Sequence, residues 1–382
     1  MRIDRMLPVG LLVTAGLGFG CGEATTGTTE TSSALAARKV NPFEARVRER
    51  KELSDPGLMP PARRTDTSLV NAWGLALDPK TGFAWISSNG AGTAEVVDED
   101  GRFQKSVALP DGSAPTGVVF NPTRSFKGDD FIFATENGTI IGVKREQRTS
   151  DPPRFPGPAA SNYKGLTIAR VHGKERLLIA DFGDELPDGS KSFGGIVVLD
   201  DDYKPISDGK FIDPELPADF SPFNVMAVGD RLFVTYAQHS DDEFHDDAKG
   251  DGLGLVDLFT TDGTFVAELV KNGPGSVLNG PWGMALKRDN DNRGDVDLVV
   301  GNFGNGAINV FDLSLSGKNA TATFDGALAT TSGQPLIIDG LWAIVNGNGR
   351  GDFDPNDIYF CAGPNDESDG VFGELDFVSA RQ

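Results

Sequence analysis

The segment Asn71-Ala72-Trp73-Gly74-Leu75-Ala76-Leu77 decides the fold, because its pattern recurs five more times along the chain. Each copy is a short apolar run, and a small or turn-forming residue usually opens it. The further copies lie at residues 114–120, 163–169, 221–228, 280–286 and 340–345. Successive copies are 43 to 60 residues apart, a spacing that suits propeller blades with loop insertions.

Each copy is followed by a turn and a second apolar run, such as Leu177-Leu178-Ile179-Ala180. Short apolar runs bounded by Gly or Asp indicate strands that are buried on both faces. Several units show a third and a fourth strand, so the sequence predicts an all-β fold, a six-bladed β-propeller. The last unit shows only three strands. We therefore expect the strand at residues 43–50 to close the last blade and remove two exposed sheet edges.

The composition agrees with this fold and excludes some functions. The chain of 382 residues has 48 glycines and 23 prolines, which argues against a helical bundle and favours many tight turns. Its formal net charge of −21 excludes nucleic acid as a partner, because phosphates would be repelled.

The beginning of the chain is typical of an exported protein. Two arginines precede an apolar run at residues 7–19, which is too short to span a bilayer and fits a secretory signal. The run ends Leu17-Gly18-Phe19-Gly20-Cys21, which resembles the bacterial lipobox, so we predict a lipoprotein-type signal at residues 1–20 and a lipid on Cys21. The alternatives are an ordinary cleaved signal and a chance cysteine.

Residues 21–42 are rich in Gly, Thr, Ser and Ala and predict a flexible tether, followed by the propeller at residues 43–382. This order of segments predicts export to the bacterial cell envelope and membrane contact only through the lipid on Cys21. Cys361 then has no partner and is expected to be an inert buried thiol.

The repeats carry a likeness to known proteins at Leu69-Val70-Asn71-Ala72-Trp73-Gly74, Ala218-Asp219-Phe220-Ser221-Pro222-Phe223-Asn224 and Ile338-Asp339-Gly340-Leu341-Trp342. Over residues 45–378 the chain resembles a family of uncharacterised exported bacterial six-bladed β-propellers, with repeats of the NHL and YVTN kind. This resemblance implies the fold. It implies no chemistry, because the family has no assigned activity.

A ligand site is expected at the mouth of the central channel, where each first strand starts and each second strand ends. The strand starts include Thr116 and Trp282. The candidate ligand-binding residues are Asn71, Asn89, Glu136, Lys164, Asp181, Asn224, Tyr236, Asn302 and Asp339. Acids, amides and aromatic rings that converge in this way suit a small molecule or a cation. The alternative is that these side chains only cap backbone groups at strand ends.

Residues 238–252 form a long acidic loop that is expected on the same face. Two of the three histidines lie in it, and His245 and Asp246 are the first candidates for binding a divalent metal. The spacing of these residues matches no zinc signature, so a merely solvated acidic loop is the alternative.

Two functions remain open from the sequence. The first is a binding or scaffold propeller, expected to be a monomer, whose partner is a small molecule, a cation or an envelope protein. The second is a lactonase-like hydrolase that holds a divalent cation such as calcium. That metal would be bound by Glu136, Asn224, Asn302 and Asp339, which have suitable ligand types. Phosphate-loop, dinucleotide-binding and nucleophile-elbow motifs are absent from the sequence.

Overall fold

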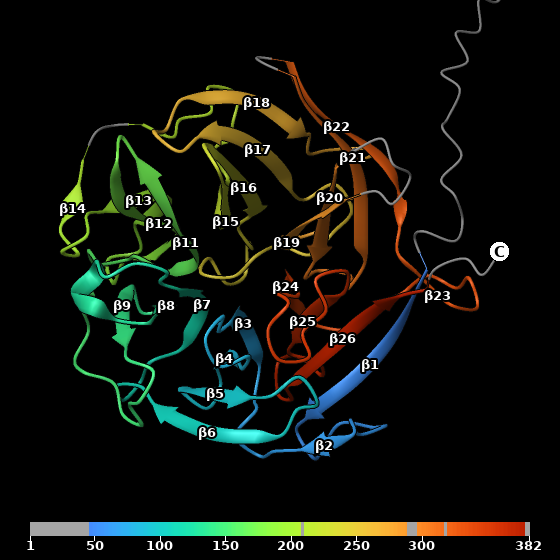
Figure 1. The fold of residues 1–382 in the computed structure, drawn as a ribbon. Coiled ribbons are helices and arrows are strands. Elements are labelled where there is room, and N and C mark those ends of the chain that lie inside the picture. Colours follow the sequence, from blue (N-terminus) through green and yellow to red (C-terminus); the bar gives the residue numbers. More distant parts are fainter. Residues whose placement is uncertain (1–45, 208–209, 289–295, 317–318, 379–382) are drawn as a thin grey trace, which may run out of the picture. The chain divides into compact units, whose positions relative to one another are not determined.

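The computed structural model describes residues 46–207, 210–288, 296–316 and 319–378, which form a ring of six β-sheets (Figure 1). Blade 1 holds β3 (Ala72–Leu77), β4 (Ala84–Ser88), β5 (Thr93–Val97) and β6 (Phe103–Ala108). Blade 2 holds β7 (Pro115–Phe120), β8 (Phe131–Thr135), β9 (Thr139–Val143) and β10 (Phe155–Pro156). Blade 3 holds β11 (Tyr163–Val171), β12 (Lys174–Glu185), β13 (Lys191–Leu199) and β14 (Pro205–Ile206).

The other three blades repeat this order from the centre outwards. Blade 4 holds β15 (Phe220–Val228), β16 (Arg231–Gln238), β17 (Leu255–Thr260) and β18 (Phe265–Val270). Blade 5 holds β19 (Pro281–Arg288), β20 (Val296–Asn302), β21 (Ile308–Ser316) and β22 (Asn319–Ala327). Blade 6 holds β24 (Leu341–Asn346), β25 (Ile358–Ala362) and β26 (Val371–Phe377). The predicted six-bladed, all-β architecture is therefore confirmed.

The predicted closing strand is present as β1 (Arg46–Ser54), which pairs antiparallel with β26 from Val47↔Phe377 to Ser54↔Val371. Two short strands that the sequence did not indicate, β2 (Arg64–Thr65) and β23 (Ala329–Thr330), pair with β1 in parallel. In Figure 1, β1 (blue) lies directly beside β26 (red), so the two ends of the chain complete one blade.

A bulge recurs between the first and second strands of every blade. In blade 1 the register passes from Ala72↔Ser88 to Leu75↔Ile86, which leaves Trp73 and Gly74 unpaired with β4. The same shift occurs in blades 2, 3, 5 and 6, and in blade 4 a shorter bulge leaves Phe223 alone unpaired with β16. The bulge turns one side chain of each inner strand towards the centre of the ring.

The repeated glycine of this bulge lets neighbouring inner strands approach each other closely. A Cβ at Gly74 would overlap Thr116 O and lie 2.8 Å from Val118 N of β7. A Cβ at Gly283 would lie 2.6 Å from Trp342 O of β24. Real Cβ atoms essentially never come this near to backbone, so glycine is required at these two positions.

Of the remaining fold-level predictions, the burial of Cys361 is confirmed, and those for the beginning of the chain stay predictions. Cys361 is fully buried, as expected, and burial raises the pKa of its thiol. Among the described residues the single helical segment is η1 (Phe126–Gly128), and none is long and apolar enough to cross a bilayer. Residues 1–45 lie outside the described residues. They include the predicted signal, Cys21, the tether and residues 43–45 of the predicted closing strand.

Candidate ligand site at the channel mouth

Aromatic side chains fill the centre of the ring. Trp73 and Trp342 stack with ring centroids 3.6 Å apart, and Trp282 meets both rings edge-on at 6.4 and 6.1 Å. All three indoles are at most 5% exposed. We call Trp73, Trp282 and Trp342 the aromatic plug, because their rings pack against one another where the inner strands of blades 1, 5 and 6 meet.

Equivalent bulge positions in the six blades supply these side chains. Each residue directly precedes the glycine, or the residue that replaces it, in the repeated pattern: Trp73, Thr116, Lys164, Phe223, Trp282 and Trp342. All six side chains are at most 5% exposed. The sequence comparison named Thr116, Lys164 and Trp282 from this set. From the sequence, we compared the residues at which the inner strands start, not the residues at the bulge. This comparison therefore did not show that Trp73, Phe223 and Trp342 occupy the position equivalent to that of Thr116, Lys164 and Trp282.

A continuous hydrogen-bonded chain lies next to the aromatic plug. Trp342 Nε1 donates to Asn71 Oδ1 at 2.9 Å, and Asn71 Nδ2 donates to Glu367 Oε2 at 2.6 Å. Asn71 Nδ2 also lies 3.4 Å from Asn89 Oδ1, and Asn89 Nδ2 donates to Glu136 Oε2 at 2.9 Å. We call Asn71, Asn89, Glu136, Glu367 and Lys164, which binds Glu136, the mouth network. These five residues come from blades 1, 2, 3 and 6.

Lys164 is the buried cation of this network and lies next to the aromatic plug. Its side chain is 1% exposed, and its Nζ lies 2.7 Å from Glu136 Oε1 and 4.9 Å from the centre of the Trp73 ring. Burial alone would lower the pKa of Lys164, but the charge and hydrogen bond of Glu136 raise it overall. Burial likewise acts to raise the pKa of Glu136, and the Lys164 ammonium lowers it overall. Both groups are therefore held in their charged forms.

Glu367, on the loop between β25 and β26, was not predicted from the sequence. Burial, followed by repulsion from Glu136 and Asp246, raises its pKa to about 7. Its backbone has φ 63°, an uncommon conformation for a residue other than glycine. Nothing in the sequence of residues 362–367 indicated a carboxylate that reaches the mouth.

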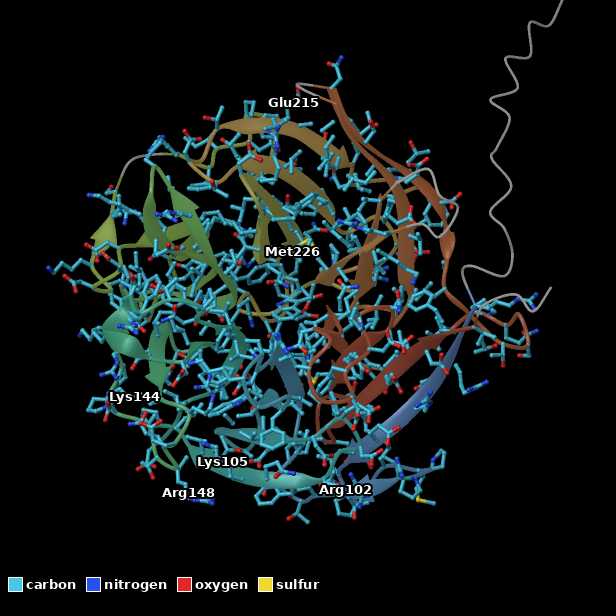
Figure 2. The ribbon with its side chains drawn as sticks, in the orientation of Figure 1. Arg102, Lys105, Lys144, Arg148, Glu215 and Met226 are labelled. Carbon is cyan, nitrogen blue, oxygen red and sulfur yellow. The ribbon has the colours of Figure 1, made fainter. Side chains whose placement is uncertain are left out.

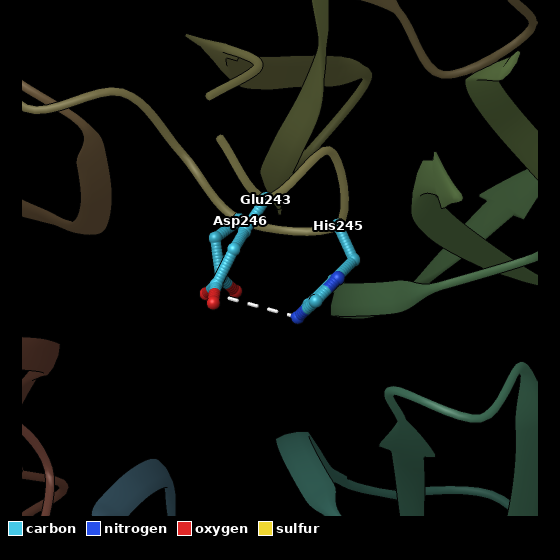
Figure 3. Close-up of side chains that lie close together, drawn as sticks. All are labelled: Glu243, His245 and Asp246. Atoms are coloured by element: carbon cyan, nitrogen blue, oxygen red, sulfur yellow. Dashed lines mark ion pairs between the residues drawn. The ribbon is translucent and has the colours of Figure 1, made fainter. Parts of the chain in front are cut away.

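The acidic loop between β16 and β17 brings three possible metal ligands together. One ligand atom from each of Glu243, His245 and Asp246 lies within 4.8 Å of the others. In Figure 3 the two carboxylates lie side by side and face the His245 ring, whose Nε2 is 3.8 Å from Asp246 Oδ2. We call these three residues the loop triad. It contains both sequence candidates, and Glu243 is the addition.

Buried side chains contact the loop between β16 and β17 and hold it in place. His239 stacks between Phe182 and Phe244, and its Nε2 lies 2.8 Å from Ser221 Oγ. Asn162 Nδ2 donates to the His245 carbonyl at 3.0 Å. Ring stacking and an amide hydrogen bond therefore hold parts of the loop against blades 3 and 4.

Asp247 is the buried acid next to the triad. Its side chain is 8% exposed, and within the described part of the chain its Oδ2 has no hydrogen-bond partner. Burial raises its pKa to about 7, opposed by Lys164 and reinforced by Asp246. Asp246 and Lys164 also act on the pKa of Glu367, so the loop and the mouth network share one electrostatic environment.

The other predicted site residues have different partners. Asp181 caps a turn by accepting from the backbone N–H groups of Asn162 and Gly183. Asn224 donates to Trp282 O at 2.8 Å, and Asn302 donates to Val277 O at 2.8 Å.

Tyr236 and Asp339 also lie apart from the mouth network. Tyr236 is buried in the cluster between blades 3 and 4, where burial and then Asp257 raise its pKa. Asp339 is exposed and accepts from the N–H of Asn365, which helps to shape the loop that carries Glu367. Of the predicted metal tetrad, only Glu136 belongs to the mouth network. The other three, Asn224, Asn302 and Asp339, make structural hydrogen bonds.

Comparison with known proteins places this geometry in context. No family model matches the chain. Two uncharacterized proteins of Acanthamoeba polyphaga mimivirus are similar: R648 is 29% identical over 82% of this chain and 76% of its own, and L690 is 25% identical over 82% of each.

Similar solved structures are more distant. Kuenenia stuttgartiensis hydrazine synthase covers 81% of this chain and 84% of its own at 14% identity, with a TM-score of 0.48. A Xanthomonas campestris gluconolactonase covers 81% and 88% at 14% identity, with a TM-score of 0.46. Neither similarity carries an argument about the activity of this chain.

Proposed function

We propose that this chain is a binding propeller whose channel mouth takes a divalent cation and, through it, a small oxygen-bearing molecule. The observation that carries this proposal is the position of the loop triad beside the mouth network: Asn162 donates to the His245 carbonyl, and the triad acts electrostatically on Glu136 and Glu367. The packed indoles of the plug fill the centre of the ring, so a ligand would be bound by the polar side chains of the mouth network and the loop.

The loop triad supports a cation as part of this ligand. Two carboxylates and an imidazole are suitable ligands for Mn²⁺ or Zn²⁺, whereas the all-oxygen set expected from the sequence would suit Ca²⁺. The buried and unpartnered Asp247 Oδ2 is a second, independent sign, because buried acceptors in folded proteins normally have a partner. A bound cation or its water would supply that partner.

The aromatic plug offers polar groups as well. The buried indole N–H groups of Trp73 and Trp282 have no acceptor among the described residues. Leaving a buried donor unpaired costs about 1–3 kcal/mol. A ligand oxygen or an ordered water above the plug would recover that energy.

Metal titration tests this proposal. Calorimetry with Mn²⁺, Zn²⁺ and Ca²⁺ on chelator-treated protein should show saturable binding of one ion, with Mn²⁺ or Zn²⁺ preferred. His245→Ala and Asp246→Asn should each weaken binding at least about tenfold. Asp241→Asn is the matched control, because Asp241 is exposed on the same loop and lies outside the triad. Equal affinities in all four proteins would refute the proposal.

A hydrolase of the lactonase type is the second candidate, and the pKa of Glu367 is the observation that favours it. A carboxylate with a pKa of about 7 is well suited to activate water as a general base near neutral pH. A panel of lactones and phosphoesters, assayed with and without metal, would detect such activity. Glu367→Gln should then lower kcat by about 100-fold or more. Failure of every substrate with metal-loaded protein would eliminate this candidate.

We also propose that the propeller is exported and held at a membrane surface by a lipid on Cys21. This proposal rests on the apolar run and the small residues before Cys21. The wild-type protein should fractionate with membranes and incorporate labelled fatty acid, and Cys21→Ala should do neither. A Cys21→Ala protein that remained in the membrane fraction would contradict the proposal.

A further inference from the structure

A pocket of about 290 Å³ lies between blades 3 and 4, at the end of the blades opposite the channel mouth. The turn between β11 and β12 and the turn between β17 and β18 form two of its sides, and β13 and β14 contribute to its lining. Inner strands begin at the mouth, so the turns after β11 and β17 belong to the other face. This pocket is therefore separate from the loop triad.

Basic side chains surround this pocket in an otherwise acidic protein. The basic lining residues are His172, Lys174, Arg176 and Lys210. Charges more than about 10 Å away are largely screened at physiological salt. The local cations therefore determine the potential in the pocket, despite the net charge of −21.

The carboxylate of Asp262 lines the same pocket and lies near two of these side chains, His172 and Lys210. Its Oδ2 lies 3.8 Å from His172 Nε2 and 3.9 Å from Lys210 Nζ. Its pKa is lowered, first by the hydrogen bond from Thr260 Oγ1, so it stays ionised. Among the residues that line the pocket, the cations Lys174, Arg176 and Lys210 stand against one carboxylate, Asp262, so the lining carries a positive excess, and Asp200 beyond the lining interacts with Arg176.

The remaining lining is largely apolar. Val198, Ile206 and Phe211 contribute hydrocarbon surface beside the cations. Phe211 has φ 62°, an uncommon and costly conformation for a bulky residue, and its N–H donates to Gly263 O at 3.0 Å. A Cβ at Gly263 would lie 3.0 Å from the Phe211 ring, so the ring is packed against the β17–β18 turn.

We propose that this pocket binds a small organic anion with one compact anionic head, a carboxylate or a phosphate monoester, and one apolar ring or short chain. Lys174, Arg176 and Lys210 receive the head, and Phe211 with its aliphatic neighbours receives the body. The pocket volume matches about ten non-hydrogen atoms if each takes a share similar to that of a water molecule.

Four probes test the chemistry of this pocket by calorimetry on the wild-type protein: phenyl phosphate, benzoate, phenol and inorganic phosphate. We expect saturable millimolar or tighter binding of phenyl phosphate or benzoate, with an affinity that falls as salt is raised. Their comparison decides between phosphate and carboxylate. Equal binding of phenol would refute an anion site, equal binding of inorganic phosphate would refute the apolar part, and failure of both aryl anions to bind would refute the proposal.

Variants locate the binding. Lys174→Gln, at an exposed side chain whose loss should leave the fold intact, should weaken phenyl phosphate or benzoate at least about threefold, and Lys174→Gln with Arg176→Gln at least about tenfold. Lys144→Gln with Arg148→Gln, at the rim of blade 2 in Figure 2, removes the same formal charge elsewhere and should leave the affinity unchanged. Unchanged affinity in Lys174→Gln, or an equal loss in the control pair, would overturn the assignment to this pocket.

Discussion

At the scale of single residues, the arrangement of the mouth network depends on one buried cation, Lys164. Lys164 occupies the bulge position that tryptophan takes in blades 1, 5 and 6, and its charge is balanced by Glu136. A buried ion pair adds little net stability, but removal of one partner leaves the other charge uncompensated. The pair therefore acts mainly to hold the mouth network in one arrangement.

Lys164→Met should lower the free energy of unfolding by about 2–3 kcal/mol, because it leaves the Glu136 carboxylate without its cation. The double variant Lys164→Met with Glu136→Gln should recover part of this loss. Chemical denaturation of the wild type, the single variants Lys164→Met and Glu136→Gln, and the double variant gives the coupling free energy. A coupling of zero would show that the two groups do not depend on each other.

Asp257 is a buried acid in blade 4 that makes the stability of the protein depend on pH. Its side chain is fully buried, and burial, with help from Asp213 and Glu268, raises its pKa to about 8. The native state therefore keeps a proton that the unfolded chain loses above about pH 4. Because the native state binds more protons, this group removes stability as the pH rises from about 4 to about 8.

Asp257→Asn should remove that pH-dependent loss. The variant should equal the wild type near pH 4 and be more stable near pH 8, by an amount on the order of a few kcal/mol. Urea denaturation at several pH values checks this. If both proteins lose stability in parallel over that range, Asp257 is already ionised in the native state.

At the scale of the strand, the repeated bulge explains why the sequence was informative about the fold. Four of the six copies have a glycine at the bulge, and the close approach of neighbouring inner strands requires it there, so it left a pattern that could be counted. Glu367, Asp247 and Glu243 left no such pattern, because single loop residues reach the mouth only through the path of their loops. The strands were therefore predictable and most of the site was not.

Gly74→Ala tests the close approach directly. The new Cβ would overlap the backbone of β7 at Thr116 O and Val118 N, which cannot move without shifting blade 2. We expect a loss of about 2–3 kcal/mol, within the range for overpacked cores. Gly195→Ala in β13 is the matched control, because nothing lies within 4 Å of its Cβ position. Thermal melts that place both variants at the same midpoint would contradict this account.

At the scale of the whole molecule, stability depends on closing the ring. β1 covers the edge of β26 over its full length, and Arg50 reaches Glu374 and Asp376 at 2.7 and 2.9 Å. Propeller blades bury their faces against neighbours, so a blade that lacks its closing strand exposes an edge which another chain can pair with.

Deletion of residues 1–54 should therefore give an aggregating protein, whereas deletion of residues 1–45 should retain the melting temperature of the full chain. Size-exclusion chromatography and thermal melts of both truncations distinguish these outcomes. A monomeric 55–382 protein with an unchanged melting temperature would show that β1 is dispensable.

The most direct test of the central claim is a crystal structure of the protein grown with Mn²⁺, using anomalous scattering to locate the ion. The account predicts one strong anomalous peak at the channel mouth, bound by Glu243, His245 and Asp246 and near Asp247. A mouth without such a peak, in crystals where Mn²⁺ is bound elsewhere or nowhere, would contradict the claim that this propeller is built to hold a cation there.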